Sequence, residues 1–178
     1  DKVRDYRKML MQIELLQLQR RVQARVPLPS IRLDSEYLAG QLAAGSLLRF
    51  GTKAQQDRFL PGIARGEIVC SACLTEPRGG TDLGNMDTTA TKVDGGWLLN
   101  GTKVFISHAE HARLFFIVAT IDRGRKHKGV TAFVADPREL KGMKLGAFPM
   151  RTLKRDNLAE VHFERCFVPD EAVLGEPG

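Results

Sequence analysis

Cysteine and long apolar runs are both scarce in this chain of 178 residues, and each scarcity excludes a class of protein. The three cysteines are odd in number and too few for a disulfide scaffold, which favours a reducing compartment. The longest stretch without a charge, Tyr37 to Leu48, is shorter than the ~20 apolar residues that cross a bilayer. The chain also opens without a charged and then apolar leader, so we expect neither a membrane span nor a secretory signal.

The chain also lacks a strong excess of charged residues of one sign. The 27 lysines and arginines stand against 21 aspartates and glutamates, which gives a net charge of +6, and no aromatic residues are interleaved with the basic ones. We therefore expect no nucleic-acid partner, whereas an anionic small ligand stays open. The densest basic run, comprising Arg123, Arg125, Lys126 and Lys128, is expected to be a solvated loop between two strands.

Helical patterns occupy the first 67 residues. The stretch from Lys2 to Arg25 contains no Gly or Pro and places apolar side chains at helical spacing, which predicts an amphipathic helix. A second helix is predicted from Ser35 to Phe50, with Gly51 as its stop signal. Thr52 and Gln55 then have the spacing of a capping box, which predicts the start of a third helix that ends near Leu60-Pro61.

Short apolar or alternating runs replace the helical patterns after Glu67. The turn formers Asp94-Gly95 and Asn100-Gly101 predict tight hairpins, and Leu114 to Thr120 is apolar throughout, as in a strand buried on both faces. We therefore predict an α+β protein, with an N-terminal α-helical segment followed by a small antiparallel β-barrel or sandwich. The predicted strands are 68–74, 88–93, 97–99, 103–106, 114–120, 130–135 and 158–163.

The residues that most often carry chemistry form no familiar site here. Cys70 and Cys73 are three apart on a predicted strand, so their side chains point to opposite faces and are expected to be buried packing thiols. His108 and His111 have no obvious third ligand, so no metal site is predicted. The sequence contains neither a Gly-x-Ser-x-Gly elbow nor a dinucleotide fingerprint of three spaced glycines.

One loop, Leu74 to Asp82, combines features that suit ligand binding. Its Pro77 fixes φ, its two glycines let the backbone approach a ligand, and its threonines offer hydroxyl groups. Such a loop can cradle a pyrophosphate with its amides. An ordinary turn without a ligand explains the same residues, and the two readings stay open at this point.

This loop resembles the Thr-Glu-Pro-x-(Ala/Gly)-Gly-(Ser/Thr)-Asp signature of the flavin-dependent acyl-CoA dehydrogenase family. Three further segments are similar to that family in the same order, and the resemblance covers about residues 42–178. The segment that precedes the signature is Phe50 to Glu67. A strand motif, Asn-Gly-x-Lys-x-(Trp/Phe)-Ile-(Thr/Ser), matches Leu99 to Ser107, and the exit of the domain matches Val161 to Gly175.

The resemblance implies a middle β domain, residues 68–178, that binds FAD and a CoA thioester, preceded by part of an N-terminal helical domain, residues 1–67. Carried onto matching positions, it gives cofactor-binding roles to Cys73, Leu74, Thr75, Gly80, Thr81, Phe105, Ile106 and Ser107. Thr81 is expected to border the acyl-CoA as well, and the Ser107 hydroxyl is expected near flavin N5. Phe105 stands where the family often has Trp, which keeps an aromatic ring at that position.

The activity implied is FAD-dependent α,β-dehydrogenation of an acyl-CoA to the 2-enoyl-CoA. The family's catalytic base is a Glu of a C-terminal helical domain, and the chain stops where that domain is expected to begin. We therefore expect an internal piece of a polypeptide about twice this long, inactive alone, with no catalytic residue in this chain. Glu76 is expected to be structural.

The implied partners are an acyl-CoA, an electron-transfer flavoprotein and further copies of the chain in a dimer or tetramer. The implied location is the cytoplasm or the mitochondrial matrix. Two alternatives stay open on the same residues. One is an acyl-CoA oxidase or flavin monooxygenase on the same fold, and the other is a truncated CoA- or nucleotide-binding module without turnover.

Overall fold

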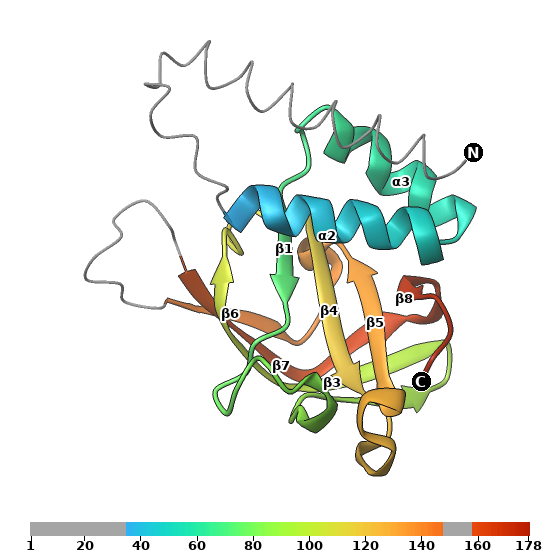
Figure 1. Cartoon of the computed structure of the whole chain (residues 1–178), viewed down its shortest axis with the longest axis vertical. Coiled ribbons are helices and arrows are strands. Elements are labelled where there is room, and N and C mark those ends of the chain that lie inside the picture. The colour runs from blue at the N-terminus through green and yellow to red at the C-terminus, as the bar shows by residue number, and fades with distance from the viewer. Residues whose placement is uncertain (1–34, 148–157) are drawn as a thin grey trace.

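A computed structural model of the protein describes residues 35–147 and 158–178 (Figure 1). The predicted helix from Lys2 to Arg25 lies outside the described residues. Of the described helices, none is long and apolar enough to cross a membrane.

The first two described elements are helices α2, Ser35–Phe50, and α3, Lys53–Ala64. The predicted stop signal is confirmed, because α2 ends at Phe50, and a Cβ at Gly51 would lie only 2.5 Å from the Leu47 carbonyl oxygen. The capping box is confirmed too: the Thr52 hydroxyl accepts a hydrogen bond from the Gln55 amide at 3.2 Å, and the Gln55 side chain accepts one from the Thr52 amide at 2.9 Å.

The predicted end of α3 at Leu60-Pro61 is wrong, because the helix runs through Pro61 to Ala64. Proline inside a helix removes one backbone hydrogen bond. Here the last turn is held by the buried side chains of Phe59 and Ile63, and the Arg65 amide closes it by donating to the Pro61 carbonyl at 3.1 Å.

Eight strands form one mostly antiparallel sheet in the order β6-β7-β3-β2-β4-β5-β8, with β1 also paired to β4. This path is open at β6 and at β8, so the described strands do not close into a barrel. Their bounds are β1 Cys70–Cys73, β2 Thr89–Val93, β3 Gly96–Ser107, β4 Leu114–Thr120, β5 Val130–Ala135, β6 Met143–Ala147, β7 Leu158–Pro169 and β8 Val173–Leu174. Four short 3₁₀ turns lie between them: η2 Leu83–Asn85, η3 Arg123–Gly129, η4 Pro137–Glu139 and η5 Asp170–Ala172.

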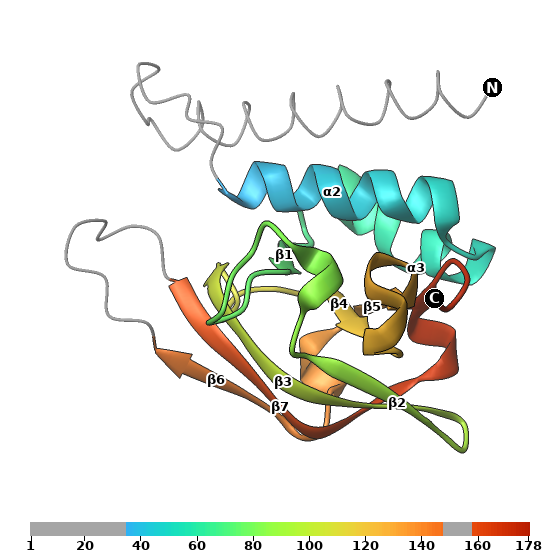
Figure 2. The ribbon, with the colours of Figure 1, turned by 60° about the horizontal axis from the view of Figure 1, so that its bottom comes forward.

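The sheet bends over on itself, so that β1, β4 and β5 lie between the helices and the layer of β3, β6 and β7 (Figure 2). Residues of β4 alternate between two apolar clusters, as the prediction of a strand buried on both faces requires: Phe115 and Ile117 face the other half of the sheet, whereas Phe116 and Val118 face α2 and α3. Cys73 belongs to the first cluster and Cys70 to the second, which confirms their opposite orientation.

The region from residue 96 to 107 is one continuous strand, β3, where two strands joined by an Asn100-Gly101 hairpin were predicted. Only the Asp94-Gly95 hairpin forms. At Asn100 the pairing of β3 with β7 shifts register, and the Asn100 side chain accepts a hydrogen bond from the Arg165 amide at 2.8 Å. Gly101, at φ +147°, lies so close to Thr88 that a Cβ would be 2.5 Å from its hydroxyl oxygen. Asn-Gly therefore forms a β-bulge, which the dipeptide alone does not distinguish from a turn.

Three further strands differ from their predictions. Strand β7 continues to Pro169, six residues beyond the predicted end at Phe163, because its second half pairs with Gly96 to Leu99 of β3. Strands β6 and β8 were not predicted. Strand β6 pairs antiparallel with the first half of β7, and β8 pairs antiparallel with β5.

Candidate functional site

The loop after β1 turns back on itself at Pro77 and Arg78. The Glu76 and Gly79 main chains exchange two hydrogen bonds of 3.0 Å, which close this turn. Gly80 then packs against Thr75, where a Cβ would lie 3.0 Å from the threonine hydroxyl oxygen. A side chain at position 80 would therefore push into Thr75, and glycine is what lets the loop fold this tightly.

Hydrogen bonds hold the start of this loop alongside the end of β3. The Val104 amide donates to the Thr75 carbonyl at 2.9 Å, and the Ser71 hydroxyl donates to the Ser107 carbonyl at 2.7 Å. The segments 73–75 and 105–107, which the sequence places about thirty residues apart, consequently run side by side. This contact brings together the predicted site residues of the loop and of the strand.

A buried ion pair fastens the same contact from inside. The Lys103 ammonium lies 2.8 Å from a Glu76 carboxylate oxygen, and the two side chains are 0% and 4% exposed. Lys103 also donates to the Leu74 carbonyl at 3.2 Å, and Glu76 accepts hydrogen bonds from the amides of Asp87 and Thr88. Each of these bonds involves the Lys103 ammonium or the Glu76 carboxylate, and the charge of that group strengthens the bond.

The Glu76 carboxylate keeps its charge despite its burial. Burial by itself raises the pKa of Glu76, but the hydrogen bonds from Lys103, from Thr88 and from the amide of Asp87 outweigh it and hold that pKa below its ordinary value of 4.5. Burial lowers the pKa of Lys103 below its ordinary value of 10.5, and the hydrogen bond and charge of Glu76 offset only part of that change. The carboxylate is thus a fixed acceptor with its oxygens occupied, which agrees with the expected structural role and leaves Glu76 unsuited to act as a base.

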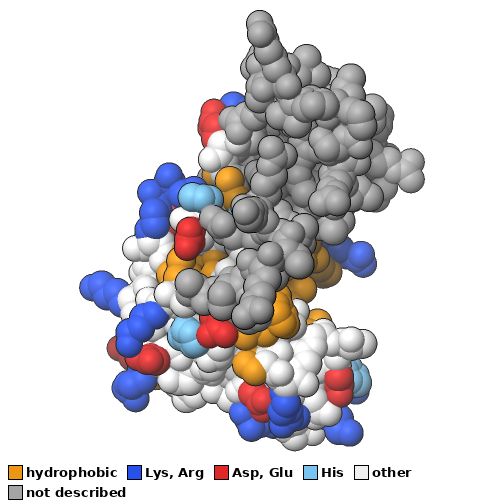
Figure 3. Space-filling view, turned by 90° about the vertical axis from the view of Figure 1, so that its left-hand side faces the viewer, with side chains coloured by type: hydrophobic (Ala, Val, Ile, Leu, Met, Phe, Trp, Pro, Cys, Tyr) orange, Lys and Arg blue, Asp and Glu red, His pale blue; other side chains and the backbone are white. Residues whose placement is uncertain are grey.

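Phe105 stands out at this junction. Its φ of +59° lies in the left-handed region, which is unfavourable for an aromatic residue, and it falls where β3 shifts register against β7 between Lys103 and Ile106. The residue is 52% exposed, and it is one of few large hydrophobic residues with such exposure in the part of the chain that the structure describes. On the face shown in Figure 3, exposed hydrophobic side chains lie between charged ones. A strained backbone that presents an aromatic ring outward is typical of a binding site.

The predicted site residues differ in what they present. Cys73 and Ile106 are buried in the first apolar cluster, so neither presents its side chain at the surface. Leu74, Thr75 and Ser107 are half-buried, whereas Gly80, Thr81 and Phe105 are exposed.

Two further predictions concern residues nearby. In the described parts of the chain no three His, Cys, Asp or Glu side chains are grouped to hold a metal, and His108 and His111 belong to one tight turn. The basic run forms the exposed turn η3 between β4 and β5, as predicted, and its Arg123 donates to the Asp87 carbonyl at 2.9 Å.

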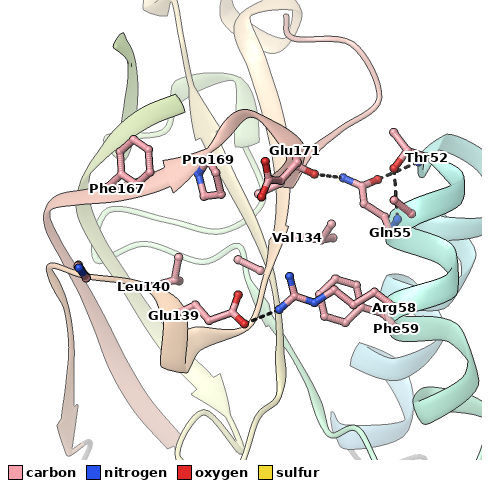
Figure 4. A pocket seen from close by; sticks show the side chains of 14 residues that line it. Thr52, Gln55, Arg58, Phe59, Val134, Glu139, Leu140, Phe167, Pro169 and Glu171 are labelled. Carbon is pink, nitrogen blue, oxygen red and sulfur yellow. Dashed lines mark hydrogen bonds and ion pairs between the residues drawn. The ribbon is translucent and has the colours of Figure 1, made fainter. Parts of the chain in front are cut away.

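A hollow with a volume of about 540 Å³ lies elsewhere, between α3 and the sheet (Figure 4). None of the predicted site residues lines it. The Gln55 side chain crosses its edge to donate to the Glu171 and Val173 carbonyls at 2.7 and 2.8 Å, and the Arg58 guanidinium lies 2.6 Å from Glu139. A smaller hollow of about 160 Å³ adjoins the loop and is lined by Leu74, Glu76, Arg78, Gly79, Asp82, Leu83, Asn85 and Met86.

Sequence reasoning missed Lys103 as a residue of the site. It lies in the strand motif, but its partner is 27 residues away, and no local pattern joins the two. The available signal was a single lysine between a predicted turn and an apolar strand, at a place where an exposed side chain explains it equally well.

Comparison with known proteins shows which family this chain resembles. Residues 71–166, more than half of the chain, match the family model described as acyl-CoA dehydrogenase, middle domain. Acyl-CoA dehydrogenase FadE34 of Mycobacterium tuberculosis is 39% identical over 142 residues, which cover 79% of this chain and 20% of that protein. The mitochondrial short-chain specific acyl-CoA dehydrogenase of Rattus norvegicus is 34% identical over 138 residues, covering 77% of this chain and 33% of that protein.

Solved structures agree with the fold. Glutaryl-coenzyme A dehydrogenase in its glutaryl-CoA complex superposes with a TM-score of 0.76 at 30% identity, covering 80% of this chain and 36% of that one. The FAD complex of PigA superposes with a TM-score of 0.74 at 31% identity, covering 80% and 38% of the two chains. The chain spans between a fifth and a third of the length of the two curated relatives described above.

Proposed function

This chain belongs to the acyl-CoA dehydrogenase family, and from that membership we propose that it supplies the flavin side of an acyl-CoA dehydrogenase active site. The reaction removes a proton from the α carbon and a hydride from the β carbon of an acyl-CoA, which leaves the 2-enoyl-CoA. Residues 68–178 are the middle β domain in this proposal, and residues 1–67 are part of an N-terminal helical domain.

One observation carries the proposal: the loop 74–82 and the strand segment 103–107, which bear the two most specific family motifs, lie side by side. Their junction exposes the Phe105 ring and has Thr75 and Ser107 at half-buried positions beside it. An exposed aromatic ring next to hydroxyl groups and a glycine-containing turn suits a flat heteroaromatic group with a pyrophosphate tail. The residues present therefore fit FAD, which when bound supplies the hydride acceptor.

Each residue of the junction has a separate task in this proposal. Gly80 and Thr81 hold the pyrophosphate, and Thr81 also borders the acyl-CoA. Phe105 packs on the ring system and excludes water from it. The hydroxyls of Thr75 and Ser107 donate hydrogen bonds to the edge of the ring that gains electron density on reduction, which stabilises the reduced form.

The proton at the α carbon requires a base that this chain does not provide at the junction. Glu76 is excluded because its oxygens already accept hydrogen bonds from Lys103, Asp87 and Thr88. We propose that the base lies in the rest of the polypeptide. A homo-oligomer, an electron-transfer flavoprotein as electron acceptor and a cytoplasmic or mitochondrial matrix location complete the proposal, and the mitochondrial location named for the rat relative supports the last of these.

The decisive experiment compares the variants Thr81→Leu and Thr91→Leu, each made in the whole polypeptide to which this chain is proposed to belong. Thr91 is an exposed threonine of β2, so it controls for the same change in size and polarity. A lost hydrogen bond to a charged phosphate costs about 1.5 to 3 kcal/mol, so we expect the Thr81 variant to bind FAD roughly 10- to 100-fold more weakly. The measurement is flavin absorbance that remains after gel filtration.

Equal flavin content in the two variants would contradict the assignment of the loop. With the flavin bound, enoyl-CoA formation with an artificial electron acceptor tests the reaction itself. Rapid oxygen consumption by the reduced protein would instead indicate an oxidase or monooxygenase. Binding of CoA without flavin or turnover would indicate a binding module.

A further inference from the structure

The buried pair of Glu76 and Lys103 joins three segments of the chain. Lys103 belongs to β3, Glu76 and the Leu74 carbonyl belong to the loop, and the amides of Asp87 and Thr88 lead into β2. The pairs Arg58–Glu139, Lys92–Asp170 and Lys144–Glu164 differ from this buried pair, because about half or more of each of their side chains is exposed. The pair thus lies at the point where three segments must keep a fixed spacing.

Stability alone does not account for a charged pair at this place. Removing two charges from water is costly, and well-packed apolar residues of similar volume often stabilise a protein as much or more. What an apolar pair lacks is direction: it forms no bond to the Leu74 carbonyl or to the two amides. The charged pair therefore fixes positions that an apolar replacement would leave free to shift.

The positions that it fixes belong to the proposed flavin site. Lys103 is followed directly by Val104, whose amide bonds the Thr75 carbonyl, and then by the strained Phe105. Glu76 follows Thr75 directly. A left-handed aromatic residue persists only where its surroundings hold it, and on the loop side the ion pair and the Thr75 to Val104 bond provide that support.

We propose that Glu76 and Lys103 are positioning residues for the flavin: together they set the spacing between the Leu74-Thr75 wall and the Phe105 to Ser107 wall of the site. This inference rests on the proposed function. Neither side chain touches the flavin in this account, because both are buried beneath the walls.

The test separates positioning from plain stability with a double variant. Lys103→Met and Glu76→Gln each leave one buried charge without its partner, so both are expected to lower the midpoint of thermal unfolding. The double variant Glu76→Met with Lys103→Met removes both charges and is expected to recover most of that midpoint. We nevertheless expect it to bind FAD at least tenfold more weakly than the unaltered protein, with a changed visible circular dichroism of the bound flavin.

A second variant covers the case in which the double variant does not fold. Glu76→Asp keeps the charge and shortens the reach by one methylene group, so a folded protein is expected, with FAD binding weakened several-fold. The matched control is Lys144→Met, which removes the lysine of an exposed pair with Glu164 and is expected to leave FAD binding and the flavin spectrum unchanged.

Two different failures are distinguishable. If the unaltered protein binds no FAD, the proposed function is wrong. If the unaltered protein binds FAD, and the folded Glu76→Asp variant or the folded double variant binds it equally well with the same spectrum, the positioning inference alone is overturned.

Discussion

Two junctions hold this domain together, and they use opposite means. At the loop-strand junction, Glu76 and Lys103 meet at 2.8 Å with almost no exposure. At the helix-sheet junction, beside the large hollow of Figure 4, the Arg58 and Glu139 side chains meet at 2.6 Å but are 48% and 59% exposed. The shorter ion pair is the one in solvent, so distance alone does not rank the two.

The difference shows what burial does to an ion pair. Exposed pairs are screened by water and contribute roughly 0 to 1 kcal/mol, whereas removing one partner of a buried pair leaves an uncompensated charge that costs about 3 to 5 kcal/mol. We therefore expect the loop-strand junction to behave as a fixed unit and the helix-sheet junction to tolerate change. The predictions that follow test that contrast.

The largest effect is expected for Lys103→Met. This change leaves the Glu76 carboxylate buried beside the amides of Asp87 and Thr88 without a cation, and it removes the donor to Leu74. The free energy of unfolding should fall by about 3 to 5 kcal/mol. Urea denaturation followed by tryptophan fluorescence measures it, since Trp97 is buried in the first apolar cluster. A loss below 1 kcal/mol would mean that the two junctions do not differ.

A smaller effect is expected for Gln55→Ala at the helix-sheet junction. The Gln55 side chain is buried, completes the capping box of α3 and donates to the Glu171 and Val173 carbonyls. Losing these bonds should cost about 2 kcal/mol, within the range for caps and for buried hydrogen bonds. Differential scanning calorimetry measures the loss. Gln56→Ala is the control, because that side chain is only half-buried and its loss should cost less.

Local signals in the sequence predicted the helix-sheet junction better than the loop-strand junction. The Thr52 and Gln55 spacing, the stop at Gly51 and the apolar run of β4 each depend on neighbours within a few residues, and each is confirmed. Such signals act through backbone hydrogen bonds and side-chain periodicity, which short windows of sequence contain.

The predictions made from the sequence failed where contacts between residues far apart in the chain determine the local structure. Asn100-Gly101 is a bulge because Arg165 and Thr88 lie against it, and neither is near in sequence. The burial of Lys103 depends likewise on Glu76, 27 residues earlier. Family resemblance named both motifs of the candidate site, but the ion pair and the hydrogen bonds that join them became visible only in three dimensions.

The acid response tests the contribution of the Glu76 charge to the loop-strand junction. The folded-state pKa of Glu76 lies below its ordinary value of 4.5, so its contribution to stability is complete above that value and is lost as the pH falls through the folded pKa. The Glu76→Gln variant lacks this contribution, so its stability should fall less steeply than that of the unaltered protein below pH 4.5. Urea midpoints between pH 6 and pH 3 measure both slopes.

The remaining acid response has a different source. Asp136, whose pKa burial would raise but the Arg138 hydrogen bonds lower, makes the same kind of contribution and stays in the Glu76→Gln variant. Some acid dependence should therefore remain in that variant. Identical slopes in the two proteins would show that Glu76 does not change its protonation between the folded and unfolded states.

The smallest effect is expected for Arg58→Ala, which removes the exposed ion pair with Glu139. Because both side chains are about half exposed, water solvates the Glu139 carboxylate that is left without its partner. The free energy of unfolding should therefore change by no more than about 0.5 kcal/mol. The Arg58 guanidinium also lies 4.9 Å from the centre of the Phe59 ring, and this contact sets the upper end of that range. Adding 1 M salt to the unaltered protein should reproduce the loss of the ion pair while leaving the buried pair intact. A loss above 2 kcal/mol, insensitive to salt, would place the helix-sheet junction in the same class as the loop-strand junction and remove the contrast between them.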